Sequence, residues 1–321
     1  MFTYTRASSV DEALSALASP GTQLLAGGTE MVNWLKEGIE QPAALVDITH
    51  LPLTGVTASA GGLRIGALTR MSDLMDHASA YPVLYESLLR AASPQLRNMA
   101  TIGGNLLQRT RCPYFRSDTP VPCNKRSPGS GCSAISGDTS GQAIFGWSQD
   151  CVATHPSDLA VALATLDASI EVVGPTGTRR IPAASFHLLP GDSPEKHTAL
   201  ERGELITAVE IPGEAPLSHY VKVRERVSYE FAVVSAAATV TLDDGVVTTA
   251  RVALGGVAHR PWRLAAAESA LVGVAIDDKP AIASAVESSF SDARPLAGNS
   301  YKVVLAQRTA VRALMTAGAL R

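Results

Sequence analysis

The chain has 321 residues, of which 46% are apolar and 18% are charged, a balance typical of a globular protein with a sizeable core. Its 27 Lys and Arg against 30 Asp and Glu give a net charge of −3 at pH 7. No basic stripe accompanies this balance, so a nucleic acid or an anionic membrane is excluded as the expected partner. At about 150 residues per domain, the length predicts two domains.

The first hundred residues predict a mixture of short helices and short strands. Ser9 and Glu12 form a capping box before a helix that Pro20-Gly21 ends. The other periodic stretches predict strands at residues 23–26, 44–48 and 63–68 and helices at residues 31–36 and 81–92.

Two glycine pairs stand beside these elements. Leu24-Leu25-Ala26-Gly27-Gly28-Thr29-Glu30-Met31 places the first pair between a strand and a helix. Backbone without side chains, the N–H groups of a helix start and the Thr29 hydroxyl suit a pyrophosphate. Thr101-Ile102-Gly103-Gly104-Asn105 repeats this chemistry after a helix. A tight turn would explain either pair alone. Together they favour a dinucleotide, although G-x-G-x-x-G and Walker A are absent.

The periodic pattern ends at about residue 106 and resumes after residue 151. This segment is rich in Ser, Gly, Pro, Thr and Arg, and loops beyond about 15 residues are uncommon unless they are functional or disordered. It holds every cysteine of the chain, Cys112, Cys123, Cys132 and Cys151.

Four kinds of chemistry could account for the clustering of these cysteines. Two disulfides are one possibility, but they are typical of a secreted chain. Structural zinc is another, but its sites normally include a short C-x2–4-C pair, which is absent here. Unrelated thiols are the third, but they would not be expected to cluster. An iron–sulfur cluster held by four thiolates would also supply the free energy that orders a segment without a core. Its negative charge would be offset by nearby cations, namely Arg109, Arg111, Lys125 and Arg126. The pattern favours the iron–sulfur cluster and leaves disulfides, zinc and unrelated thiols open.

Regular structure is expected again from Asp158. The patterns predict a helix at 159–166, strands at 169–174, 206–211, 220–226, 231–242 and 246–254, and a helical tail from about 264. A boundary near residues 212–216 divides the chain into 1–214 and 215–321. Residues 1–6 show no secretory signal, so a cytoplasmic location is expected, with periplasmic export on a signal-bearing partner as the alternative.

Several motifs in this order resemble the FAD-binding medium subunit of the xanthine dehydrogenase family of molybdenum hydroxylases. They are the two glycine segments, Ile65-Gly66-Ala67-Leu68-Thr69, His155-Pro156-Ser157-Asp158 and Tyr220-x-Lys222-x-Arg224. The cysteine segment, with Arg111-Cys112-Pro113-Tyr114-Phe115 and Pro122-Cys123-Asn124-Lys125, is similar to the flavin subunit of bacterial periplasmic aldehyde oxidoreductases. In that subunit an inserted loop carries a [4Fe-4S] cluster.

The resemblance implies an α+β fold. It consists of a vanillyl-alcohol-oxidase-like FAD domain of two subdomains, with the iron–sulfur loop inserted at about 106–151, and a C-terminal α+β domain with an antiparallel sheet and helices. Residues 24–31 would bind the pyrophosphate, and Thr101, Ile102, Gly103, Gly104 and Asn105 would approach the rest of FAD. Ser157 and Asp158 would lie near the flavin, Ile206 would pack on its ring, and Lys222 would contact it; Asp158 also suits a helix N-cap.

The function implied is electron transfer in a heterotrimer, with no catalytic residue on this chain. A large partner would carry the molybdenum cofactor, and a small partner would carry [2Fe-2S] clusters. An external acceptor would take the electrons. The alternatives are a self-contained flavin oxidase or reductase and a zinc-stapled interaction domain without enzymatic activity.

Overall fold

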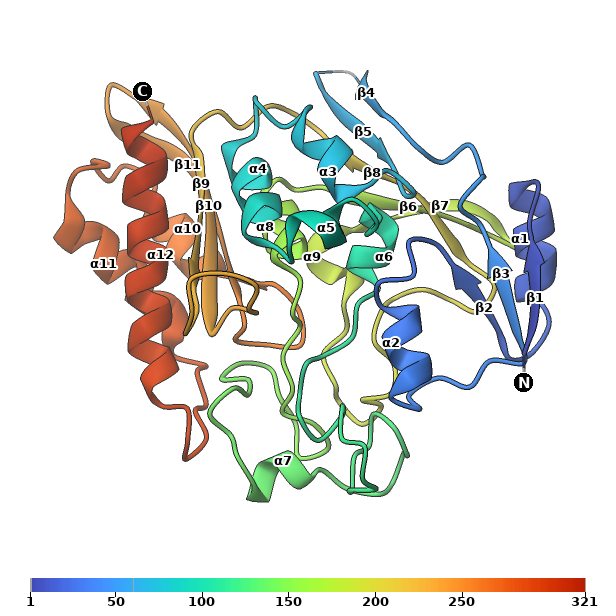
Figure 1. The fold of residues 1–321 in the computed structure, drawn as a ribbon. Helices are drawn as coiled ribbons and strands as arrows, with labels where there is room; N and C mark the ends of the chain where they lie inside the picture. Colours follow the sequence, from blue (N-terminus) through green and yellow to red (C-terminus); the bar gives the residue numbers. More distant parts are fainter. Residues whose placement is uncertain (1, 60, 321) are drawn as a thin grey trace.

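The computed structural model describes residues 2–59 and 61–320, which form helices and three β-sheets (Figure 1). Two sheets belong to the N-terminal two thirds of the chain, and the third belongs to the C-terminal third. The architecture therefore mixes helices and strands, as predicted, and it includes a parallel sheet that the sequence patterns do not indicate.

The first sheet is small and parallel, with the order β1-β3-β2. Its elements are β1 (Thr3–Arg6), α1 (Val10–Leu17), β2 (Thr22–Leu25), α2 (Met31–Lys36) and β3 (Ala44–Asp47). The Ser9 side chain caps α1 by accepting from the backbone N–H of Glu12 at 3.1 Å, as predicted. The Glu12 carboxylate, however, accepts from the N–H of Ser8 at 2.7 Å, so the reciprocal half of the capping box is shifted by one residue.

The second sheet is antiparallel and has the order β4-β5-β8-β6-β7. Its strands are β4 (Val56–Ser59), β5 (Gly62–Gly66), β6 (Ser169–Gly174), β7 (Gly177–Pro182) and β8 (Leu205–Ile211). The helices beside it are α3 (Met71–Met75), α4 (Pro82–Arg90), α5 (Pro94–Arg97), α6 (Ile102–Leu106), α8 (Asp158–Thr165) and α9 (Ala183–Phe186). Every residue of α8 is buried, because this helix lies between the second sheet and the third.

The third sheet has the order β12-β11-β10-β9 and is antiparallel. Its strands are β9 (Ser218–Val223), β10 (Val234–Asp243), β11 (Val246–Gly255) and β12 (Trp262–Arg263). The helices are α10 (Ala265–Ala270), α11 (Lys279–Glu287), a 3-10 turn (Ser288–Phe290) and α12 (Tyr301–Ala319), which packs along the sheet (Figure 1). Asp244 and Gly245 turn the β10–β11 hairpin with φ of 44° and 80°, a conformation typical of tight hairpins.

The cysteine segment is irregular apart from α7 (Ser133–Ser136) and lies below both halves of the molecule in Figure 1. It is held from both sides. Lys302 of α12 donates from Nζ to the carbonyls of Gly141 and Gln142 at 2.8 and 3.0 Å. On the other side, Arg116 pairs with Glu30 and Glu37 around α2. The segment therefore connects the N-terminal part of the chain with the C-terminal part.

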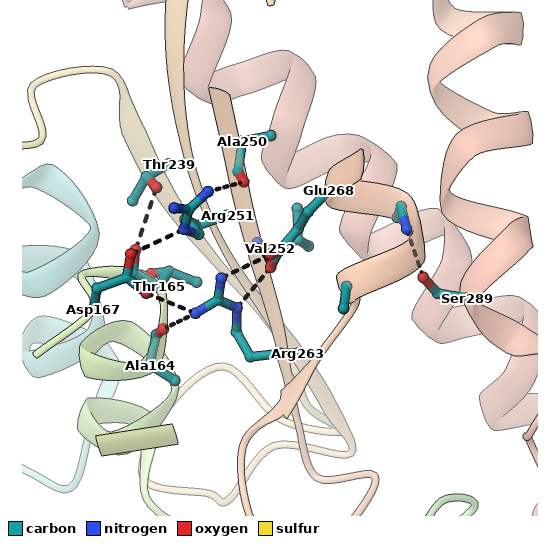
Figure 2. Close-up of polar contacts among 12 residues, drawn as sticks. Ala164, Thr165, Asp167, Thr239, Ala250, Arg251, Val252, Arg263, Glu268 and Ser289 are labelled. Atoms are coloured by element: carbon teal, nitrogen blue, oxygen red, sulfur yellow. Dashed lines mark hydrogen bonds and ion pairs between the residues drawn. The ribbon is translucent and has the colours of Figure 1, made fainter. Parts of the chain in front are cut away.

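A polar cluster joins the end of α8 to the third sheet (Figure 2). Asp167 accepts from Arg251 and from Arg263, each at 2.9 Å. Arg263 also donates to the carbonyl of Ala164 at 2.8 Å and, through two nitrogens, to the carboxylate of Glu268 at 2.6 and 2.7 Å. One guanidinium thus bridges the helix between the sheets and the C-terminal elements.

Candidate cofactor sites

The first glycine segment lines a cavity of about 480 Å³ between the parallel sheet and α6. The predicted residues that line it are Leu24, Ala26, Gly27, Gly28, Thr29, Glu30, Met31, Thr101, Gly103, Gly104 and Ile206. A volume of this size is in the range of small-molecule and cofactor sites.

Gly27 and Gly28 are required by the backbone at this place. A Cβ on Gly27 would lie 1.8 Å from the carbonyl oxygen of Met99, so only glycine lets this loop touch the chain that leads to Thr101. Gly28 has φ +74°, in the left-handed region. The N–H groups from Gly27 to Glu30 donate to no acceptor within residues 2–59 and 61–320. Consecutive unpaired donors beside a cavity are suited to an anion.

The second glycine segment differs from the first in its hydrogen bonds. The N–H groups of Ile102 and Gly103 donate to the carbonyls of Thr69 and Ala67 at 2.9 and 2.8 Å. Gly104 donates to the Thr101 hydroxyl oxygen at 3.2 Å, which is the N-cap bond of α6. Tertiary contacts therefore use the N–H groups of Ile102 and Gly103, so this segment has fewer free donors than the first, and its role toward FAD stays a prediction. It offers side-chain-free surface instead.

A second cavity, of about 350 Å³, continues from the first. Thr29, Glu30 and Gly104 line both cavities. The second cavity adds Asn105, Asp158 and Lys222 of the predicted set, together with Arg111 and Phe231. The two cavities thus form an elongated site with the first glycine segment at their junction.

A buried ion pair forms one wall of the second cavity. Lys222 donates from Nζ to Asp158 Oδ2 at 2.7 Å, with side chains only 1% and 5% exposed, and to the carbonyl of Arg90 at 3.0 Å. Burial raises the pKa of Asp158, while the Lys222 ammonium and the Tyr220 hydroxyl, which donates to Oδ1, oppose this rise. The paired charges fix the lysine at the cavity wall, where it can stabilise negative charge on a bound group.

Ser157 rather than Asp158 caps α8. Its hydroxyl oxygen accepts from the N–H of Ala160 at 3.0 Å, and its O–H donates to Asn105 Oδ1 at 2.6 Å. The N-cap interpretation of Asp158 is therefore wrong, because this residue already lies in the first turn. Ser157 lines neither cavity, but its hydroxyl holds the side chain of Asn105, which lines the second cavity.

Three further placements differ from the simplest expectation. Leu25 packs with Met31 and Trp34, and Ile102 lies in the main core, so neither lines a cavity. Ile206 lines the first cavity, whereas Asp158 and Lys222 line the second. The role of Tyr220 was missed, although its i, i+2 spacing from Lys222 on a strand places both side chains on one face of the sheet.

All four cysteines line one small cavity in the inserted segment. Their thiols are free, and Cys123 and Cys132 face each other across an isolated β-bridge. Burial raises the pKa of Cys112, and that of Cys151 to about 12. Backbone N–H groups of Tyr114 and Phe115 point at Cys112, and that of Ala153 points at Cys151, which favours the thiolates. Among the described residues, no group of three or more His, Cys, Asp and Glu is placed so that it could hold a metal ion.

The four cations near the cysteines have different partners. Arg109 pairs with Glu40, Arg111 pairs with Glu30, and exposed Arg126 donates to the carbonyls of Ser117 and Gly38. Lys125 alone lines the cysteine cavity. Burial lowers the pKa of Lys125, and Cys151, Cys123 and Cys112 are the nearby groups that raise it.

None of the helices in the described part of the chain is both long and apolar enough to cross a membrane. Comparison with family models matches residues 1–214 to the FAD binding domain in molybdopterin dehydrogenase. Residues 219–317 match the CO dehydrogenase flavoprotein C-terminal domain.

Individual relatives agree with these two matches. The chain is 48% identical to the aldehyde oxidoreductase FAD-binding subunit PaoB of Escherichia coli, over 99% of this chain and 98% of that one. It is 29% identical to the carbon monoxide dehydrogenase medium chain of Afipia carboxidovorans, over 89% and 84% of the two chains.

Among solved structures, a chain of the Cu,Mo-CO dehydrogenase superimposes with a TM-score of 0.76 at 27% identity, over 100% of this chain and 98% of that one. A chain of quinoline 2-oxidoreductase from Pseudomonas putida 86 gives a TM-score of 0.76 at 25% identity, over 99% and 97%. The predicted α+β fold class is thereby confirmed. The chain belongs to the family of FAD-binding subunits of molybdenum hydroxylases.

Proposed function

We propose that this chain is the electron-transfer subunit of an aldehyde oxidoreductase-like molybdenum hydroxylase. Electrons would be released at a molybdenum centre on a large partner and relayed by [2Fe-2S] clusters on a small partner. FAD bound to this chain would supply the chemistry that takes up these electrons and gives them to an external acceptor. The observation that carries the proposal is the elongated double cavity, with its unpaired N–H groups at the junction.

The chemistry of the two cavities supports an assignment of the two halves of FAD. The N–H groups from Gly27 to Glu30 would hold the diphosphate at the junction. The adenosine half would occupy the larger cavity, where Trp34 and Ile206 offer apolar surface. The flavin ring would occupy the second cavity, where Lys222 would favour a negatively charged reduced form and Asp158 would hold the lysine in place. Residues 1–214 would form this FAD domain, and residues 215–321 the C-terminal domain.

We further propose that Cys112, Cys123, Cys132 and Cys151 hold a [4Fe-4S] cluster. Four free thiols around one cavity, N–H groups directed at two of the sulfurs and the irregular backbone of the segment that holds them all support this assignment. The two proposed redox sites are also neighbours along the chain. Arg111 lines the flavin cavity and Cys112 the cysteine cavity, and consecutive Cα atoms are about 3.8 Å apart.

Cofactor analysis of the protein purified without air, together with its partners, tests both assignments. We expect one FAD, four iron and four sulfide per chain, as for one [4Fe-4S] cluster. Gly27→Ala should lose most of its FAD, because the added methyl group collides with the Met99 carbonyl. Gly213→Ala is the matched control, since nothing lies within 4 Å of its added Cβ. Cys132→Ser should lose iron and sulfide but keep FAD.

The possible results separate the proposals. A colourless protein that takes up no FAD would refute the flavin assignment and leave an interaction domain. A yellow protein without iron would refute only the cluster. Reduction of the flavin by an aldehyde in this chain alone would contradict the dependence on a molybdenum partner and favour a self-contained flavoenzyme.

A further inference from the structure

Lys125 is the cation of this group that lines the cysteine cavity, and it has no acidic partner among the described residues, whereas Arg109 and Arg111 pair with Glu40 and Glu30 and Arg126 is exposed. Its side chain lines the cysteine cavity, and its Nζ donates to the carbonyl of Pro194 at 2.6 Å. No carboxylate forms an ion pair with it among residues 2–59 and 61–320. Asp150 also lines the cavity, but its Oδ1 accepts from Asn124 at 3.2 Å.

Apart from Asp150 and the cysteines, the titratable groups around Lys125 carry no negative charge. His155, His197 and His259 lie close enough to be affected by its charge, and burial lowers the pKa of each so that the ring is neutral at pH 7. Arg109 adds a second positive charge nearby, although that charge is paired with Glu40. A desolvated ammonium in neutral surroundings is costly unless an anion compensates it. Within the described part of the chain, Asp150 bonds to Asn124 and forms no ion pair with Lys125, so the sulfurs of the cavity, as thiolates, are the groups that remain to supply this anion.

We propose that Lys125 is the charge-compensating residue of the cysteine-held centre and that it sets the reduction potential of this centre. This inference rests on the proposed cluster. Four thiolates around a [4Fe-4S] core leave a net negative charge, which increases when the centre takes up an electron. A fixed positive charge at the cavity wall stabilises the reduced form more than the oxidised form, so it raises the potential. Lys125 is therefore a positioning and tuning residue, not a cluster ligand.

Substitution with matched controls tests the role of this charge. Lys125→Met removes the charge and keeps an unbranched chain, whereas Lys125→Arg keeps the charge. Arg126→Met is the matched control, because it removes an adjacent charge that faces solvent. The measurement is the midpoint potential of the cluster, from a redox titration of the complex followed by electron paramagnetic resonance. Iron and sulfide contents are measured in parallel.

We expect Lys125→Met to lower the ratio of reduced to oxidised cluster about tenfold at a fixed ambient potential. For a one-electron centre this corresponds to a midpoint potential that is lower by about 59 mV. Lys125→Arg should restore most of this ratio, and Arg126→Met should leave it within about twofold, because solvent screens that charge. If Lys125→Met loses its iron while Lys125→Arg keeps it, the role in charge compensation is supported.

Two results would overturn the inference. One is an unchanged potential in an iron-replete Lys125→Met protein. The other is equal loss of iron from Lys125→Met and Lys125→Arg, since a role in packing alone would produce it. Absence of iron from the unmodified protein would instead refute the cluster itself, so the two failures are distinguishable.

Discussion

Asp47, at the end of the central strand β3, links this strand to the neighbouring strand β1 and to the turn that follows β3. Its Oδ2 accepts from the Tyr4 hydroxyl at 2.6 Å, and its Oδ1 accepts from the N–H and hydroxyl of Thr49 at 2.8 and 2.6 Å. Burial acts to raise the pKa of Asp47, but these hydrogen bonds and Arg6 outweigh it and lower the pKa to about 2. The folded carboxylate is therefore more acidic than the unfolded one.

The sign of this shift gives a prediction for acid stability. A depressed folded pKa contributes stability above pH 4, which is lost as the pH falls from about 4 to about 2. Asp47→Asn should lower the free energy of unfolding by about 1 kcal/mol at pH 7 and by clearly less at pH 2. Urea titrations of both proteins at several pH values measure the difference. A difference that stays constant over this range would contradict the role of the charge.

Sequence reasoning at this scale succeeded where the chemistry is local and failed where it depends on distant partners. The two glycine segments look alike in the sequence, yet only the first keeps its glycine N–H groups unpaired among the described residues, because Ala67 and the Thr101 hydroxyl accept from Gly103 and Gly104 of the second. The burial of the Lys222–Asp158 pair likewise depends on how β9 packs against α8. Neither outcome is encoded in the residues of the segment itself.

Among the elements, α6 and α8 are coupled through a single hydroxyl group. Ser157 caps α8 and donates to Asn105 of α6, which lines the second cavity. The cap thus orients both the helix that begins with Asp158 and the amide of Asn105.

Replacing this hydroxyl tests the coupling. Ser157→Ala should lower the free energy of unfolding by about 1–2 kcal/mol, because α8 loses its cap and a buried amide oxygen loses its donor. Ser185→Ala is the control, since the Ser185 hydroxyl is exposed and its only bond, to the Pro182 carbonyl, is 3.3 Å long. Thermal unfolding of the two variants measures the difference. Equal stability would show that the cap and the Asn105 bond contribute nothing.

Most elements follow from periodicity, and the exceptions have a physical reason. The strand predicted at 169–174 matches β6, and the helix predicted at 159–166 is shifted by one residue from α8. The strand predicted from residue 231 begins only at Val234, because residues 224–233 form a loop in which Tyr229 has φ +53°. This loop lines the second cavity through Tyr229 and Phe231, so its apolar residues serve a site and not a sheet.

At the scale of the whole molecule, Arg263 connects α8 with the C-terminal elements (Figure 2). The Arg263 side chain is 21% exposed and has partners both at α8 and among the C-terminal elements. The Arg251 side chain is 40% exposed, and Asp167 is its one partner across this junction among the described residues. Loss of Arg263 would leave the Ala164 carbonyl without its donor and Glu268 with the N–H of Val252 alone.

Arg263→Met should therefore destabilise the protein by about 2 kcal/mol, and Arg251→Met by less than about 1 kcal/mol. Thermal unfolding at low and at high salt checks both values, and the effect of Arg263 should persist at high salt because its bonds are shielded. Equal effects of the two substitutions would show that the junction depends on packing and not on this guanidinium.

The enclosure of the cysteine cavity has a consequence for biogenesis. Lys302 and Asn299 tie the cysteine segment to the C-terminal part of the chain, and Arg116 ties it to Glu30 in the first glycine segment. Under the proposed assignment, iron would reach the buried Cys123 and Cys151 more readily before these ties close. Glu30 gains its partners Arg111 and Arg116 only once the cysteine segment is in place, so the geometry of the first glycine segment depends on the folding of the cysteine segment.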